Sequence, residues 1–187
     1  MQLQTIKDRI PDYAKDLRLN LDAVLQRSSL PPAQATGAAL AAASAARAPA
    51  LVSALRDESS IEPAHARAAL TAAALMGMNN AWYPFVEMAA DPDLKTMRPE
   101  LRMNAYATYG GVDRASFELY ALAASIVGKC EFCVAAHSRL LRESGYTAQQ
   151  LRDVGRIAAV VNGVAQVLAA EGAVVASNDA IPEDATA

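Results

Sequence analysis

Residues 118–137 read ELYALAASIVGKCEFCVAAH and hold the chemistry around which the chain is organised. The stretch contains both cysteines of the protein, Cys130 and Cys133, and one of its two histidines, His137. Apolar and small residues precede the pair at helical spacing, and Gly128 marks the end of that predicted helix. A second helix is predicted to start at Cys130. The stretch therefore predicts two consecutive helices with reactive side chains at their junction.

The composition of the chain favours helices over strands. Apolar residues make up 53% of the 187, aromatic residues only 5%, and alanine, the strongest helix former, is abundant. No stretch shows the alternation and turn residues of a strand hairpin. We therefore predict an all-α fold. The helices are expected near residues 1–10, 11–27, 33–46, 51–56, 63–78, 81–88, 99–105, 113–128, 130–142 and 147–170.

Several segments are predicted to break or begin these helices. Asn79-Asn80 suggests a turn or helix junction, and Pro84 should interrupt the helix that follows. Residues 91–93 are interpreted as a connector. Asp113 and Thr147 are the predicted N-caps of the helices after them.

The helices are predicted to form one domain over residues 1–171. Its N-terminal half, about 1–95, would act as a scaffold, and its C-terminal half, about 96–171, would carry the catalytic groups. Residues 172–187 are small, polar and acidic and are expected to be a frayed tail.

A faint internal repeat relates the two halves at a separation of about 80 residues. The triplet at 42–44, Ala-Ala-Ser, recurs at 123–125. In this register Pro49 and Val52 correspond to Cys130 and Cys133. One half would then have kept the chemistry while the other serves as scaffold.

Charge and hydropathy exclude several functions. The net charge is −3 and no basic stripe stands out, so nucleic-acid binding is not expected. The N-terminus has no cationic segment followed by an apolar core, so a secretory signal is not expected. The sequence also has no run of 18 or more apolar residues, so a membrane span is not expected. We expect a cytoplasmic protein, and in that compartment a close cysteine pair is more often catalytic, redox-sensing or metal-binding than structural.

The spacing of Cys130, Cys133 and His137 places all three on one face of a helix. A Cys-x-x-Cys pair at a helix start can close a disulfide, and the free N–H groups there favour a thiolate. His137 can take the thiol proton, and the otherwise apolar surroundings of Glu118 make this carboxylate the candidate that orients the imidazole. The hypothesis is a relay from Glu118 through His137 to Cys133, with Cys130 as the second thiol. The helix start favours Cys130 as the more acidic thiol, whereas His137 favours Cys133.

Other interpretations of the same residues remain. The two cysteines could be small core residues. Together with His137 and Glu118 they could also bind zinc in a zinc-stabilised helical module, although structural zinc sites usually draw on a second Cys/His pair. We expect neither a metal nor a tightly bound cofactor.

The spacing Glu118-x11-Cys130-x2-Cys133-x3-His137 resembles the carboxymuconolactone decarboxylase-like superfamily in its alkylhydroperoxidase D (AhpD) branch. The likeness extends over roughly residues 1–170 and includes the segments 11–16, 19–21, 76–80, 101–104, 117–119 and 163–166. The resemblance implies an AhpD-like all-α fold with an internal helical duplication, assembled as a homotrimer.

The resemblance also implies an activity. It is that of a thiol-dependent peroxidase that regenerates the peroxiredoxin AhpC. Electrons would come from dihydrolipoamide on an acyltransferase subunit, recharged by dihydrolipoamide dehydrogenase and NADH. Cys133 would form the sulfenic acid and the mixed disulfide, Cys130 would be proton donor and resolving thiol, and the pair would close a redox disulfide. His137 would be the base and Glu118 its relay partner.

Two points qualify that expectation. Family members often carry histidine immediately before the second cysteine, where this chain has Phe132. Loss of that imidazole would weaken direct peroxidase activity more than dithiol exchange. A carboxymuconolactone decarboxylase-like enzyme on the same fold is the alternative, and such an enzyme would not need the cysteine pair.

Overall fold

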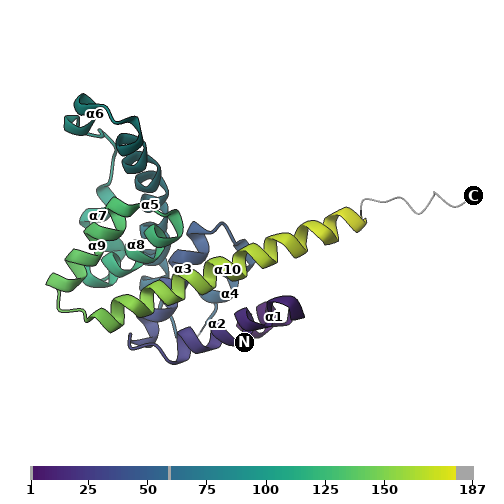
Figure 1. The fold of residues 1–187 in the computed structure, drawn as a ribbon. Helices are drawn as coiled ribbons and strands as arrows, with labels where there is room; N and C mark the ends of the chain where they lie inside the picture. Colours follow the sequence, from purple (N-terminus) through teal and green to yellow (C-terminus); the bar gives the residue numbers. More distant parts are fainter. Residues whose placement is uncertain (1, 59, 180–187) are drawn as a thin grey trace, which may run out of the picture.

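The computed structural model describes residues 2–58 and 60–179, and within them the chain forms helices and no strand (Figure 1). The predicted all-α fold is confirmed. The α-helices are α1 (Gln2–Asp8), α2 (Lys15–Gln26), α3 (Pro32–Ala45), α4 (Pro49–Arg56), α5 (Pro63–Ala89), α6 (Pro92–Thr96), α7 (Asn104–Ala107), α8 (Arg114–Gly128), α9 (Glu131–Glu143) and α10 (Ala148–Asp179). Two 3-10 turns, η1 (Asp12–Ala14) and η2 (Tyr109–Gly111), join them.

The core is built on α3 and α8, which pack against each other and against α5 and α10. Every residue from 35 to 43 of α3 and from 116 to 125 of α8 is buried. Small side chains permit this close approach. Gly37 lies against the ring of Tyr120, where a Cβ would overlap the ring. The hydroxyl of Tyr120 meets Nδ1 of His65 at 2.5 Å, so this buried phenol is satisfied.

Helix α10 covers one side of that core. Within the described residues it is the one helix that by length and composition could cross a membrane, over Ala148–Ala173 with a mean hydropathy of 1.2. Its buried residues include Val154, Ile157 and Val161, and the helix packs on α2, α3 and α8. We therefore interpret its apolar character as that of a core helix.

Helix α10 is also longer than predicted. The sequence placed its end near residue 170 and a tail from 172, but the helix continues to Asp179. Ala173 and Ala176 favour a helix in this segment. Residues 180–187 of the predicted tail lie outside the described residues.

The break predicted at Asn79-Asn80 and Pro84 is wrong, because α5 runs through all three. Both asparagines instead bind neighbouring segments: Asn79 Nδ2 lies 3.5 Å from Met103 Sδ, and Asn80 Nδ2 donates to the carbonyl of Ala124 at 3.3 Å. Pro84 removes one helical hydrogen bond. Burial of Val86 just beyond it favours continuation of the helix.

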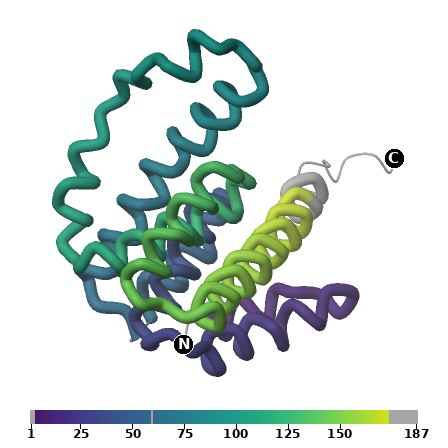
Figure 2. Tube along the Cα trace, turned by 60° about the vertical axis from the view of Figure 1, so that its left-hand side comes forward, coloured from purple at the N-terminus to yellow at the C-terminus, as the bar shows by residue number. Residues whose placement is uncertain are grey.

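The segment from the end of α5 to α7 projects from the helical body as an arm (Figure 1, Figure 2). Two predictions fail here. Residues 91–93 are not a plain connector, because Asp91 caps α6 by accepting the N–H of Asp93 at 2.8 Å. The helix predicted over 99–105 is instead the short α7, which starts at Asn104.

The internal repeat is visible in matching helix junctions. Arg47 before α4 and Lys129 before α9 both have left-handed backbone, with φ of 57° and 56°. The next residue in each half donates its N–H to a carbonyl five residues back, from Ala48 to Ala43 at 3.1 Å and from Cys130 to Ser125 at 3.3 Å. These contacts match Ala48, not Pro49, with Cys130. The predicted register was therefore wrong by one residue, and Leu51 takes the place proposed for Val52.

We expect Gly37→Ala to lower the free energy of unfolding by about 1–3 kcal/mol, because its methyl group would displace the Tyr120 ring from a close-packed core. Gly77→Ala on α5 is the matched control. A Cβ at Gly77 meets nothing within 4 Å, so this substitution should stabilise the helix by up to about 1 kcal/mol. Urea unfolding of the three proteins provides the measurement, and equal midpoints for both variants would contradict the packing argument.

Candidate active site

The two cysteines lie where α8 ends and α9 begins. Helix α8 closes with Lys129 in the left-handed conformation, and Gly128 is required there because a Cβ would overlap the Asn80 amide. Cys130 then caps α9, since its Sγ accepts the N–H of Cys133 at 3.3 Å. Both side chains are free thiols and both are buried. The predicted helix thus begins one residue later, with Cys130 as its cap.

Glu118 and His137 form a buried pair beneath the thiols. Nδ1 of His137 donates to Oε2 of Glu118 at 2.6 Å, so no bridging water is needed between them. The Tyr106 hydroxyl donates to Oε1 of Glu118 at 2.7 Å, and Arg114 Nε lies 3.7 Å from the same oxygen. Burial acts to raise the pKa of Glu118, but the hydrogen bonds from His137 and Tyr106 outweigh it and hold this pKa below its ordinary value. The carboxylate is therefore ionised and fixes the imidazole tautomer.

The second step of the predicted relay is not formed in this structure. Nε2 of His137 faces Met76 Sδ at 3.2 Å, and no hydrogen bond joins His137 to a thiol within the described residues. His137 and Cys133 nevertheless line the same cavity of about 190 Å³. A molecule bound in that cavity would contact both groups.

The thiol of Cys133 is less acidic than the sequence suggested. Burial raises its pKa to about 12, and the adjacent Cys130 sulfur adds to the rise. The nearby Ser125 hydroxyl and the backbone N–H of Cys133 itself act in the opposite direction. The prediction of a lowered pKa was based on the free N–H groups of the helix start and on His137, whereas the Cys133 side chain is only 3% exposed and the imidazole faces Met76.

Sequence reasoning missed four residues of the site. Tyr106 binds Glu118, as described above, and Ser125 is a fully buried serine beside Cys133 whose Oγ has no partner in the hydrogen-bond geometry. Asn80 packs under the α8–α9 junction. The ring of Tyr83 stacks on Phe132 with centroids 4.3 Å apart, and burial together with the nearby thiols raises the Tyr83 pKa. None of the four lies at a motif spacing. Packing of α5 and α7 brings Asn80, Tyr83 and Tyr106 to the site, and the turn between α8 and α9 brings Ser125.

The zinc alternative has no geometric support. In residues 2–58 and 60–179, no three His, Cys, Asp or Glu side chains gather as a metal site requires. Nδ1 of His137 is bound to Glu118, and Nε2 faces Met76 Sδ rather than the thiols.

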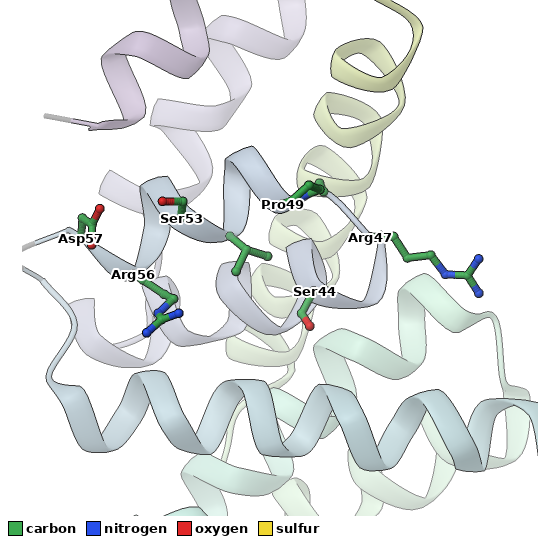
Figure 3. A pocket seen from close by; sticks show the side chains of 8 residues that line it. Ser44, Arg47, Pro49, Ser53, Arg56 and Asp57 are labelled. Atoms are coloured by element: carbon green, nitrogen blue, oxygen red, sulfur yellow. The ribbon is translucent and has the colours of Figure 1, made fainter. Parts of the chain in front are cut away.

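A larger cavity, of about 620 Å³, lies in the scaffold half beside α4 (Figure 3). Its position corresponds to that of the thiol site in the repeat, but it holds no thiol. Arg47 and Arg56 point in different directions from its wall (Figure 3), so they do not converge on one ligand. Size alone would favour this cavity, but the chemistry places the candidate active site at α9.

We expect Ser125→Ala to raise the Cys133 pKa, because the substitution removes a buried hydroxyl that is free to donate to the thiolate once it forms. The thiolate fraction below pH 9 should fall about tenfold. The rate of iodoacetamide alkylation against pH, measured in a Cys130→Ser background, reports this directly. Ser138→Ala on α9 serves as control, and superimposable profiles for all three proteins would show that Ser125 does not act on the thiol.

We expect the stability of Glu118→Gln to depend less on pH than that of the wild type. Because the folded pKa of Glu118 is depressed, its contribution is complete above the unfolded value near 4.5 and is lost as pH falls through the folded pKa. Glu118→Gln should therefore cost about 1–3 kcal/mol near neutral pH and less at about pH 3. Urea unfolding across this range tests the sign, with the exposed Glu131→Gln as control. A constant difference between Glu118→Gln and the wild type would contradict it.

Comparisons with known proteins identify the family of the chain. The model of the carboxymuconolactone decarboxylase family matches residues 92–176. An alkyl hydroperoxide reductase AhpD from Rhodospirillum centenum is 45% identical, with 92% of this chain and 94% of the relative covered. Proteins of the same name from Bradyrhizobium sp. and Coxiella burnetii are each 42% identical, covering 91% and 88% of this chain and 94% and 96% of their own lengths. With its all-α fold, the chain belongs to the AhpD family of the carboxymuconolactone decarboxylase-like superfamily.

Proposed function

We propose that this chain is an antioxidant thiol-disulfide oxidoreductase with alkyl hydroperoxidase activity. The observation that carries the proposal is the pair of adjacent thiols at the start of α9, with Cys130 Sγ 3.3 Å from the Cys133 N–H and the Glu118–His137 pair one turn below. The relatives compared above are named as alkyl hydroperoxide reductases, which supports the same chemistry here.

In the proposed oxidation, Cys133 Sγ attacks the terminal peroxide oxygen. An S–O bond forms and the O–O bond breaks, giving a sulfenic acid at Cys133 and an alcohol. His137 takes the thiol proton and returns it to the leaving alkoxide, because this residue lines the same cavity as Cys133. Glu118 stabilises the imidazolium that forms between these steps. Cys130 then attacks the sulfenic sulfur, so that the disulfide closes and water leaves.

The proposed reduction takes two electrons from a dithiol. Dihydrolipoamide would open the Cys130–Cys133 disulfide and leave as the cyclic disulfide lipoamide. We propose that it is carried by a lipoylated acyltransferase and renewed by dihydrolipoamide dehydrogenase with NADH. The reduced chain would in turn regenerate an AhpC-type peroxiredoxin by the same exchange. No tightly bound cofactor or metal takes part in this scheme.

The proposed assembly is a homotrimer in the cytoplasm. Exposed apolar side chains on the arm support association, because such surface is normally covered. They are Phe85, Met88, Met97 and Leu101, with exposed fractions of 47%, 79%, 61% and 38%.

A decarboxylase or lactone-processing activity is the second candidate, because the family model that matches the chain is named for such an enzyme. The two candidates differ in their need for thiols. Replacing both cysteines with serine would abolish peroxide reduction but leave a decarboxylase active.

We expect the reduced protein to lose two hydrogens by intact mass and both free thiols on reaction with cumene hydroperoxide, and to regain them with dihydrolipoamide. Cys133→Ser should be inactive, whereas Cys130→Ser should stall with one added oxygen. His137→Gln should lower the oxidation rate at least about 100-fold, since it removes the proposed acid and base.

The matched control is His65→Gln, which removes the only other histidine, bonded to Tyr120 outside the site. Its oxidation rate should equal that of the wild type. Thiols that survive excess peroxide and oxidised lipoamide would rule out the redox proposal and favour the decarboxylase.

A further inference from the structure

Two aromatic rings stand directly beside the thiols. Tyr83 comes from α5 and Phe132 from α9, and their rings stack with centroids 4.3 Å apart and an angle of 23° between planes. Both rings form part of the wall of two separate cavities. Each of those cavities reaches one cysteine and not the other.

The cavity at Cys130 has a volume of about 220 Å³ and a charged rim. Glu87, Lys129 and Glu131 line it, and all three are exposed. Pro84 forms part of its wall from α5. Because the side chains of this rim are exposed, a flexible dithiol arm attached to a larger carrier can reach the cavity from solvent.

The cavity at Cys133 has a volume of about 190 Å³ and mainly apolar walls. Ala136, Leu140 and Met103 line it together with His137. The apolar walls favour a small hydroperoxide with an alkyl or aryl group, because burial of that group removes apolar surface from water. The peroxide would then lie next to both the sulfur and the imidazole.

We propose that the Tyr83–Phe132 stack divides the dithiol into two entrances, an apolar one at Cys133 for an organic hydroperoxide and a charged one at Cys130 for the reducing dithiol. This inference rests on the proposed function, which it deepens by assigning each substrate to its own cysteine. Phe132 is the specificity-determining residue, because of the two stacked rings it is the one that lies between Cys130 and Cys133 along the chain.

The division determines which sulfur the reductant attacks. A thiolate of the dithiol forms a bond with Cys130 Sγ, the Cys130–Cys133 bond breaks, and Cys133 leaves as a thiolate that takes up a proton. The second donor thiol then displaces Cys130 from the mixed disulfide, releasing a cyclic disulfide and leaving Cys130 as a thiol. Two electrons and two protons are transferred in all. The mixed disulfide therefore forms at Cys130, whereas the family resemblance implied Cys133.

A crossed pair of variants tests the division. Ala136→Phe fills only the cavity at Cys133, and Pro84→Phe fills only the cavity at Cys130. Stopped-flow measurement follows two half-reactions separately, oxidation of the dithiol by cumene hydroperoxide and reduction of the disulfide by dihydrolipoamide. Ala136→Phe should slow oxidation about tenfold and change reduction less than about twofold, and Pro84→Phe should do the reverse. If each variant slowed both half-reactions to the same extent, the division into two entrances would be overturned.

A labelling experiment keeps this test independent of peroxidase activity. The reduced proteins are treated briefly with N-phenylmaleimide, and tandem mass spectra of the tryptic peptide 130–139 assign the label to Cys130 or Cys133. Ala136→Phe should protect only Cys133 and Pro84→Phe only Cys130. If the thiols of the wild type ignore peroxide but this pattern appears, the proposed function fails and the two entrances stand. If both variants protect the same cysteine, the two entrances are refuted.

Three further variants guard against misfolding and test the partition itself. Ala136→Leu and Pro84→Leu are smaller replacements at the same positions and should show the same crossed pattern with smaller changes. Phe132→Ala removes one ring of the stack and should join the two cavities. In that background Ala136→Phe should no longer protect one cysteine selectively, and retained selectivity would show that Phe132 is not the partition.

Discussion

A buried carboxylate is the constraint on which the site depends. Glu118 is 1% exposed within the buried stretch of α8, and an isolated charge there would be very costly. Its oxygens accept from His137 on α9 and from Tyr106 on α7, with Arg114 nearby. Satisfying one charge therefore positions two other helices against α8. The imidazole orientation and the placement of the α9 thiols follow from the same requirement.

The scaffold half of the duplication lacks both the buried charge and the side chains that bind it. In the register set by Arg47 and Lys129, Thr36 occupies the place of Glu118, and its hydroxyl only meets that of Ser60, at 2.8 Å. Leu55 and Leu51, both fully buried, occupy the places of His137 and Cys133. The same helical frame is thus stable with an apolar interior. The polar groups of the second half are not needed for this packing, which is consistent with a catalytic purpose.

The sequence predicted most of the helices and the Glu118–His137 contact because both depend on local patterns: helical periodicity, caps and motif spacing. It failed where tertiary contacts outweigh local preference. Pro84 and Asn79-Asn80 look like breakers, but α5 continues through them because Val86 is buried and both asparagines bind neighbouring segments. The acidity of Cys133 and the contact of His137 with Met76 depend on burial and side-chain direction, which motif spacing does not specify.

The cap of α9 has a consequence for how the chain would register its own redox state. Most helices are capped by oxygen, but here the Cys130 sulfur accepts the Cys133 N–H. A bond between the two sulfurs would replace the S–H of that acceptor with an S–S bond and change its direction, so oxidation would alter the backbone at the first turn as well as the side chains. The amide of Cys133 would then report the oxidation state, and a partner that contacts this turn could distinguish the oxidised from the reduced chain without touching either sulfur.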